Sequence, residues 1–393
     1  MFFKQTILPK TLCLIILLSV FAKKSCVLFK YAYFNATMQA INIFGRIVKQ
    51  AIFRVVFGDK MSDLDRSDMK TLIHDFPKHC ENSWNLAQKT GLKAKIDEII
   101  ISGMGGSAIG GDIIGSYIKN IPVIVNRGYE IPSFISQNTL FFAVSFSGNT
   151  EETISALNHA YDKKAQIIVI SSGGKIKQIA IEKELPFIEI PNIGQPRVAL
   201  AYLFFPILRV LHNMKIVDAE KDVAAAISSL IEEQNQISNQ MKDMAKRLKA
   251  KVPLIYASDN LCAVAYRWKT QINENAKQHA FYHLLPEMNH NEIVAYENKN
   301  NIFKSIFIVD DDDHERIKKR VEIFADVVKG ADVEIIKLHG SCFLARMIKG
   351  IHMGDWLSYY LALENNVDPT PVKIIELLKK ELKLSVEKNQ IFK

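Results

Sequence analysis

The chain has 393 residues, too many for one small core, and its 48% hydrophobic and 23% charged residues are ordinary for a globular enzyme. Residues 1–60 account for the whole net charge of +8, because they hold nine of the 50 basic residues and one of the 42 acidic ones. The remainder carries 41 of each, which argues against a nucleic-acid partner. Five widely spaced cysteines without a CxxC pair predict reduced thiols rather than a disulfide scaffold.

The first sixty residues differ in composition from the rest. Thr11–Ala22 is an apolar run between lysines that is short for a bilayer span but fits the hydrophobic region of a signal peptide. An export or membrane signal, an amphipathic anchor and an upstream extension of doubtful authenticity are all open. Met61 opens a stretch typical of a natural N-terminus, with Ser62 or Asp63 able to cap a helix. We favour the extension, and expect a cytoplasmic protein with no membrane partner for residues 61–393.

From residue 61 to 218, apolar runs alternate with segments of helical pattern. The apolar runs predict strands over 97–102, 122–126, 139–145, 166–171 and 187–190. The segments of helical pattern predict helices over 65–93, 113–119 and 151–163. This alternation is typical of a doubly wound parallel sheet, which binds ligands at the carboxyl ends of its strands.

A long polar stretch, 219–251, is nearly free of glycine and proline and predicts a helical linker between two lobes. A second alternation follows, with strands over 254–257, 303–309 and 334–338 and helices over 260–277, 314–329, 342–364 and 374–382. We therefore predict an α/β fold of two doubly wound parallel-sheet lobes, 61–218 and 252–393, with a helix-rich linker and C-terminal helices. The similar order of elements indicates an internal duplication.

Two loops that follow predicted strands fit an anion. In Gly103–Asp112, glycines let backbone amides approach a ligand closely, and the next helix adds partial positive charge at its N-terminus. In Ser145–Thr153, hydroxyl groups accompany the amides. Together the loops predict a phosphate site. Its candidate residues are Gly105, Gly106, Ser107, Ser145, Ser147 and Thr150.

A dinucleotide-binding turn is the main alternative for the first loop, because Gly103, Gly105 and Ala108 nearly match its fingerprint. That fingerprint expects an acidic residue at the end of the second strand, where this chain has Asn126 and Arg127. No Walker Gly-Lys-Ser/Thr is present either, so a nucleoside triphosphate is not implied. Turn glycines without any ligand remain the third interpretation.

Six motifs in a fixed order carry a family resemblance: GMGGSAIGGD at 103–112, SFSGNTEET at 145–153, QPR at 195–197, NENAK at 273–277, PEMNHNEI at 286–293 and DPTPV at 368–372. On these residues the chain resembles the SIS (sugar isomerase) domain, and specifically the bifunctional phosphoglucose/phosphomannose isomerases, over about 65–385. The resemblance implies two SIS lobes, no metal or organic cofactor, and a homodimer in which a histidine of one subunit completes the site of the other.

The implied reaction is the reversible conversion of glucose 6-phosphate or mannose 6-phosphate into fructose 6-phosphate through an enediolate. By resemblance, Glu274 is the base, Arg197 the family arginine and His290 the group that opens the sugar ring. A lysine near the C-terminal helix also takes part in the family, and Lys379 and Lys380 are the candidates. These residue types suit proton transfer and stabilisation of an oxyanion.

Other interpretations of single residues compete with these assignments. His279 and His283 have helical spacing and could bind zinc together with His290 or Glu292. Asp310–Asp313 follows a predicted strand, and we expect a solvated loop and helix cap there.

Two further expectations concern packing and function class. For Trp268 and Trp356 we expect packing rather than sugar stacking. A protein that senses a sugar phosphate without reacting, and an amino-sugar enzyme, are the alternative functions.

Overall fold

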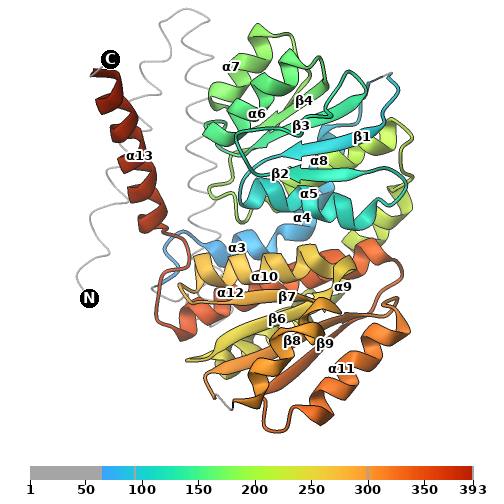
Figure 1. Ribbon diagram of the computed structural model, residues 1–393, viewed down its shortest axis with the longest axis vertical. Coiled ribbons are helices and arrows are strands. Elements are labelled where there is room, and N and C mark those ends of the chain that lie inside the picture. Colours follow the sequence, from blue (N-terminus) through green and yellow to red (C-terminus); the bar gives the residue numbers. More distant parts are fainter. Residues whose placement is uncertain (1–63, 93, 299–300, 392–393) are drawn as a thin grey trace, which may run out of the picture. The chain divides into compact units, whose positions relative to one another are not determined.

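The computed structural model describes residues 64–92, 94–298 and 301–391, with side chains described as far as residue 382. The expected signal or extension at 1–60 lies outside these residues. Residues 63–393 form one compact unit that contains two parallel β-sheets (Figure 1). Each sheet belongs to one lobe, which we call the first and the second lobe in chain order.

The sheet of the first lobe has five parallel strands in the order β2-β1-β3-β4-β5. Every residue of β3 is buried, and so are the last four of β1, as expected for central parallel strands that are covered on both faces. The strands are β1 (Glu98–Ser102), β2 (Val123–Asn126), β3 (Thr139–Ser145), β4 (Gln166–Ser171) and β5 (Phe187–Glu189).

Helices cover both faces of this sheet (Figure 1). Ile99 and Ile101 of β1 belong to the same hydrophobic cluster as α5 (Gly106–Tyr117) and α8 (Leu200–Asn213). Ile100 points to the opposite face and clusters with α6 (Glu151–Asp162) and α7 (Gly174–Glu182). This alternation follows from the two-residue period of a strand. Two further helices, α3 (Met69–His74) and α4 (Phe76–Leu86), precede the sheet.

The sheet of the second lobe has four parallel strands in the order β7-β6-β8-β9. One face clusters with α11 (Glu315–Val327), and the other with α10 (Cys262–Asn275) and α12 (Phe343–Glu364). The strands are β6 (Val252–Ser258), β7 (Phe281–Leu285), β8 (Phe303–Asp310) and β9 (Val333–Leu338), and the short 3-10 helices are η2 (Asp259–Leu261), η3 (Glu287–His290) and η4 (Glu292–Glu297).

The two lobes share one hydrophobic core. A single cluster of buried side chains includes Ile101 of β1, Leu203 of α8, Trp268 of α10 and Ile306 of β8. Helix α10 contacts α5 of the first lobe, and α9 (Glu220–Leu248) packs along α12. The helices α5, α8, α10 and α12 therefore form a common layer between the sheets, and α9 is packed against it rather than free. The chain ends in α13 (Lys373–Ile391).

These observations confirm the predicted α/β fold with two doubly wound parallel-sheet lobes, and the helix predicted over 219–251. They also confirm packing for Trp268 and Trp356, which are 0% and 1% exposed. Cys80, Cys262 and Cys342 are free thiols, as expected. None of the helices in the described part of the chain is long and apolar enough to cross a membrane.

Some predicted elements were wrong in extent. The helix expected over 65–93 is two helices, α3 and α4, divided at Asp75, and Pro77 lies in the first turn of the second, where it is tolerated. The helix expected over 113–119 already begins at Gly106, because packing of α5 against α8 outweighs the low helix propensity of glycine. Strand β7 and helix α8, which carries Pro206, were not predicted.

A buried ion pair joins α10 to α12. The Arg267 Nε lies 3.0 Å from the Asp355 Oδ1, and Gln271 Nε2 donates to the same oxygen at 2.8 Å. Arg267 is 1% and Asp355 4% exposed. Burial raises the pKa of the Asp355 carboxyl, and the Arg267 guanidinium opposes that rise. The pair is thus a charged contact that the apolar layer encloses, and each partner is needed to neutralise the other.

Removing one charge should destabilise the protein strongly. In Asp355→Leu, Arg267 is left as a buried cation without its counter-charge, which costs about 3–5 kcal/mol in the free energy of unfolding. Urea unfolding measured by circular dichroism checks this. The double variant Arg267→Met/Asp355→Leu is the control, and should recover most of the loss because no isolated charge remains. A single variant as stable as the parent chain would contradict this account of the pair.

Candidate functional site

The first sheet has its topological switch point between β1 and β3. The chain runs from β1 to the strand on one side of the pair, β2, and from β3 to the strand on the other side, β4. In open parallel sheets, the crevice beyond the carboxyl ends of such strands is where ligands bind. The two glycine- and hydroxyl-rich loops begin at this point. The first follows Ser102, the last residue of β1, and the second starts at Ser145, the last residue of β3.

One hydrogen bond links the two loops, and others hold the second loop together. The Phe146 backbone N donates to the Ser107 Oγ at 3.3 Å, and the Ser145 Oγ lies 2.9 Å from the Thr150 Oγ1. The Gly148 N donates to the Ser145 Oγ at 3.1 Å. Gly148 has a φ of 70°, and a Cβ there would lie 1.7 Å from the Gly173 carbonyl oxygen. Only glycine fits this turn, which fixes the second loop.

The hydroxyls of the two loops differ in exposure. Ser107 and Ser145 are buried, Thr150 is half-buried and Ser147 is exposed. The Ser147 Oγ accepts a hydrogen bond from the Asn149 N at 3.3 Å. Helix α5 begins at Gly106 and α6 at Glu151, inside the segments predicted as loops, so the N-terminal amides of two helices adjoin these hydroxyls. The arrangement offers donors and partial positive charge to an anion.

Arg197 and Glu274 meet beside the first loop. The Arg197 Nη1 lies 3.2 Å from the Glu274 Oε2, although 77 residues separate them in sequence. A Cβ built on Gly106 would lie 2.9 Å from the Pro196 carbonyl oxygen, so Arg197 directly follows a residue in close contact with that loop. The structure therefore brings the predicted arginine and the predicted base together, next to the predicted phosphate loop.

Two further contacts fix the arginine. Its Nη2 donates to the Thr370 carbonyl oxygen, and its own carbonyl oxygen accepts a hydrogen bond from Arg267. The Arg197 side chain is 4% exposed, while that of Glu274 is 31% exposed. Burial lowers the pKa of Arg197, and the Glu274 carboxylate opposes that shift. The fixed Arg197 cation suits stabilisation of an oxyanion, and the solvent-accessible Glu274 carboxylate beside it suits a base.

Two groups at this site were not assigned from the sequence. The Lys277 Nζ donates to the Glu274 carbonyl oxygen at 2.7 Å and to the Pro369 carbonyl oxygen at 3.0 Å. The Thr370 Oγ1 is buried, and no partner for it occurs in the described part of the chain. Both lie in motifs that carried the family resemblance, NENAK and DPTPV, but the resemblance assigned a role only to Glu274 in the first and to no residue in the second.

The structure does not bring the remaining candidates to this pair. His290 is exposed at the end of η3, and Lys379 and Lys380 are exposed on α13. Within residues 64–92, 94–298 and 301–391, none of the three makes a hydrogen bond or ion pair through its side chain. Their predicted roles stay predictions.

The residues of the zinc alternative have other partners. The His283 Nδ1 lies 2.8 Å from the Glu292 Oε2, and the Tyr256 hydroxyl donates to the Glu292 Oε1 at 2.7 Å. His279 stacks on Phe281 instead, with ring centroids 6.4 Å apart. Among the described side chains, no three His, Cys, Asp or Glu residues converge as a metal site requires.

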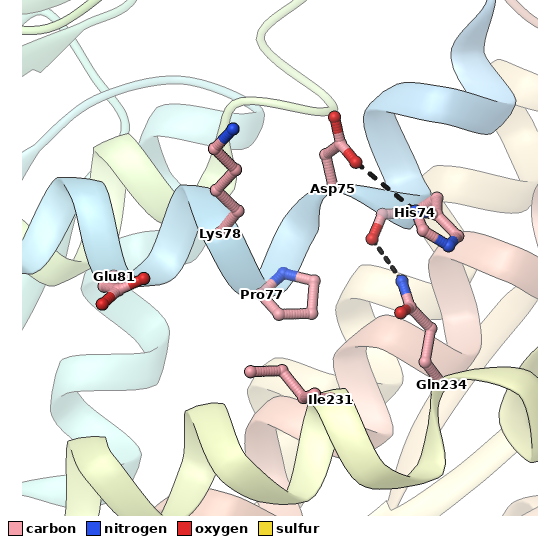
Figure 2. A pocket seen from close by; sticks show the side chains of 7 residues that line it. All are labelled: His74, Asp75, Pro77, Lys78, Glu81, Ile231 and Gln234. Atoms are coloured by element: carbon pink, nitrogen blue, oxygen red, sulfur yellow. Dashed lines mark hydrogen bonds and ion pairs between the residues drawn. The ribbon is translucent and has the colours of Figure 1, made fainter.

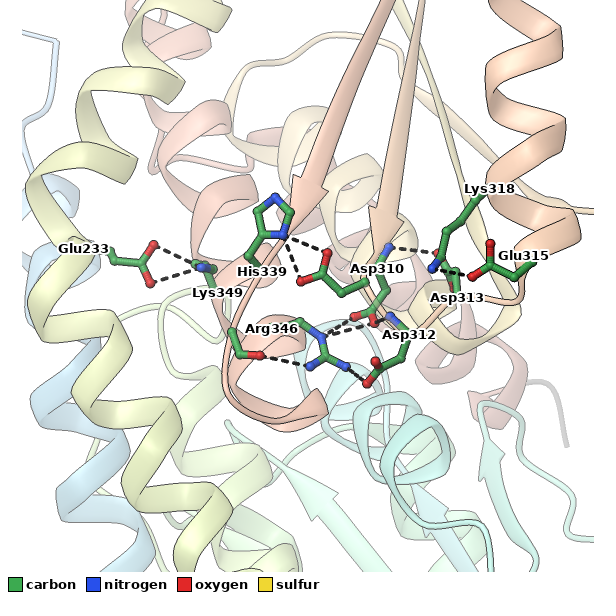
Figure 3. A network of polar contacts seen from close by, with 11 residues as sticks. Glu233, Asp310, Asp312, Asp313, Glu315, Lys318, His339, Arg346 and Lys349 are labelled. Atoms are coloured by element: carbon green, nitrogen blue, oxygen red, sulfur yellow. Dashed lines mark hydrogen bonds and ion pairs between the residues drawn. The ribbon is translucent and has the colours of Figure 1, made fainter.

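The corresponding edge of the second sheet is acidic and internally paired. Asp310 ends β8, and the Arg346 Nε lies 2.9 Å from its Oδ2 (Figure 3). The expectation of a solvated loop holds for Asp311 and Asp312, which are exposed, and is wrong for Asp310 and Asp313, which are 2% and 4% exposed. The N-cap of α11 is His314 and not an aspartate. Arg346 supplies the counter-charge for Asp310, and the Asp310 backbone N donates to the Asp313 Oδ2 at 2.8 Å.

A separate pocket of about 210 Å³ lies where α3 and α4 face α9 (Figure 2). Gln234 donates to the backbone oxygen of His74 across it. None of the predicted site residues lines this pocket, so it is distinct from the candidate site. Its lining consists of His74, Asp75, Pro77, Lys78, Glu81, Ile231 and Gln234.

Family models match both lobes. Residues 93–178 match the SIS domain, and residues 237–382 match the bacterial phospho-glucose isomerase C-terminal SIS domain. Among solved structures, the C-terminal domain of glucosamine-fructose-6-phosphate aminotransferase from Francisella tularensis is similar, with a TM-score of 0.60 at 16% identity over 77% of this chain and 98% of that one. At that identity the likeness shows the fold alone.

Two relatives are more similar in sequence. D-glucosamine-6-phosphate 4-epimerase from Sulfolobus acidocaldarius is 36% identical over 55% of this chain and 69% of its own length. The bifunctional phosphoglucose/phosphomannose isomerase of Caldicellulosiruptor bescii is 38% identical over 330 residues, which are 79% of this chain and 97% of the relative. With both lobes, the paired loops and the Arg197–Glu274 contact in place, the chain belongs to the family of bifunctional phosphoglucose/phosphomannose isomerases.

Proposed function

We propose that the chain interconverts glucose 6-phosphate, mannose 6-phosphate and fructose 6-phosphate as a reversible aldose–ketose isomerase. The observation that carries the proposal is the Arg197–Glu274 pair beside the hydroxyl-rich loops. A phosphate held by the loops would leave the sugar carbons free to reach the pair. Family membership supports the same substrates, because the relative's name includes both sugars.

In the proposed mechanism, Glu274 is the base. Its carboxylate takes the proton from C2 of the open-chain aldose, the electron pair of that C–H bond forms the C1–C2 double bond of an enediolate, and the electron pair of the C1 carbonyl moves onto O1. The proton then returns to C1, the proton of the C2 hydroxyl passes to O1, and the C2–O2 bond becomes the carbonyl of the ketose. Negative charge grows on the oxygens during this step, and the buried Arg197 guanidinium provides a fixed positive charge close by.

Phosphate recognition is proposed for the two loops. Ser107, Ser145, Ser147 and Thr150 provide hydroxyl donors, and Gly105 and Gly106 provide amides at the start of α5. No lysine or arginine contributes a side chain to these loops, so hydroxyls, amides and helix N-termini would bind the dianion. This donor set suits one phosphomonoester better than a polyphosphate.

Ring opening is proposed for His290 with one of Lys379 and Lys380. His290 is exposed, and within the described residues its side chain makes no hydrogen bond or ion pair, which fits a residue that serves the site of a second subunit. We therefore propose a homodimer with shared active sites. We further propose that residues 61–393 contain all the catalytic parts, as a first lobe to 218, the segment 219–251 and a second lobe from 252.

A coupled assay tests the proposed function. Residues 61–393, produced alone, should convert glucose 6-phosphate and mannose 6-phosphate into fructose 6-phosphate, because all the proposed site residues lie in this range. Glucosamine 6-phosphate serves as the competing substrate, with galactosamine 6-phosphate as the product of 4-epimerisation. Turnover of the amino sugar alone would replace the proposal by the amino-sugar alternative, and binding without turnover of any sugar would favour a sensor.

The base assignment has its own test. Glu274→Gln should lower kcat by at least about 100-fold, because the amide cannot accept the carbon-bound proton. The KM should stay close to the parent value, since the phosphate loops are untouched. Glu182→Gln on exposed α7 is the matched control and should be fully active. Steady-state kinetics check both, and turnover retained in Glu274→Gln would refute the assignment.

Metal removal separates this mechanism from the zinc alternative. After dialysis against EDTA, isomerase activity should be unchanged, because Arg197 supplies the positive charge in the proposed step. Metal analysis of the dialysed protein and assays with added zinc complete the measurement. Activity that disappears with the metal and returns with zinc would favour a site built from His279, His283, His290 and Glu292.

A further inference from the structure

Lys277 has an unusual backbone and two side-chain partners. It follows Ala276, the C-cap of α10, and adopts a φ of 53° in the left-handed region where glycine or asparagine is the common choice. Its side chain turns back to the Glu274 carbonyl oxygen and across to the Pro369 carbonyl oxygen. The ammonium thereby joins the end of α10, which carries the base, to a segment 92 residues further along the chain.

Arg197 binds the same segment one residue later. Its Nη2 donates to the Thr370 carbonyl oxygen, so two cations hold two consecutive carbonyl groups. The segment is also fixed internally, because the Thr370 N donates to the Asp368 Oδ1 at 2.9 Å. Lys277 is therefore the second of two ties between residues 368–370 and the pair formed by Arg197 and Glu274.

Two other lysines provide an internal comparison. Lys164 and Lys215 also follow helix C-caps with a φ of 60°. All three lysines are exposed, but within residues 94–298 the side chains of Lys164 and Lys215 make no hydrogen bond or ion pair. The left-handed backbone alone thus does not give a lysine side chain such partners. What distinguishes Lys277 is the pair of carbonyl groups presented to its ammonium.

We propose that Lys277 is a positioning residue of the isomerase site, whose ammonium clamps residues 368–370 to the end of α10 and so holds Arg197 and Glu274 in working register. The proposal rests on the proposed function for its kinetic consequence. It assigns Lys277 no contact with the substrate. When the clamp is lost, the segment that binds Arg197 is released, and the guanidinium and the carboxylate are no longer held at one distance.

The surroundings make the clamp sensitive to pH. Partial burial, together with the Arg197 guanidinium, lowers the pKa of Lys277 to about 8, against the opposing effect of Asp368 and Glu274. Below that pH the ammonium keeps its charge and three donors. As the pH rises through about 8, it loses one proton and its charge, and the clamp weakens. Activity should therefore fall on the alkaline side.

Kinetics of matched variants test the clamp. Lys277→Met should lower kcat by about 10- to 100-fold with KM within about threefold of the parent, because orientation is lost while the phosphate loops stay intact. Lys215→Met removes a lysine from the same backbone conformation and should be unchanged. Lys277→Arg keeps a permanent cation, so it should retain much of the activity and lose the alkaline decline near pH 8.

Hydrogen exchange gives a readout that does not need turnover. Amides of residues 366–372 should exchange faster in Lys277→Met than in the parent, and Lys215→Met should match the parent. This measurement separates the clamp from the proposed function. If the parent chain isomerised no sugar, the proposed function would be refuted, but the exchange result would still test the clamp. A rise in KM alone would identify a substrate contact, and unchanged kcat and exchange in Lys277→Met would overturn the proposal.

Discussion

The site depends on one buried arginine outside it, Arg267. Asp355 neutralises Arg267 within the helical layer, and the Arg267 Nη2 also donates to the Arg197 carbonyl oxygen. The first lobe's arginine is thereby attached to the second lobe's helices. Because Arg197 also pairs with Glu274 of α10, the same helix positions both the Arg197 guanidinium and the Glu274 carboxylate. Arg197 lies in a loop, but these contacts position it as precisely as a residue of a helix.

The two lobes repeat one fold and differ in the chemistry of their strand ends. The first sheet ends in serines, free amides and helix N-termini, which suit a phosphate. The second sheet ends in Asp310, whose negative charge is neutralised by Arg346. An anion would meet negative charge there, and Arg346 is already bound to Asp310. We therefore propose an anion site at the first sheet only, with Glu274 of α10 as the second lobe's contribution to the chemistry.

The sequence predicts the fold well where patterns are local. Apolar runs such as Thr139–Ser145 predict buried strands, and the glycines and hydroxyl groups that follow β1 and β3 predict the two phosphate loops. The pattern fails at β7, whose exposed Phe281 and half-exposed neighbours lack a buried run. It also fails at α8, because Pro206 argues against a helix in the sequence, whereas tertiary packing stabilises one. The Arg197–Glu274 pair became visible only by resemblance, because no spacing in a sequence predicts a contact 77 residues apart.

The helical layer between the sheets has a consequence for the history of the chain. Because α5 of one lobe contacts α10 of the other, and α8 and α12 belong to the same hydrophobic cluster, separating the lobes would expose core side chains of both. Substitutions in one half must be matched by complementary ones in the other. Recombination between relatives is thus best tolerated when both lobes are inherited together.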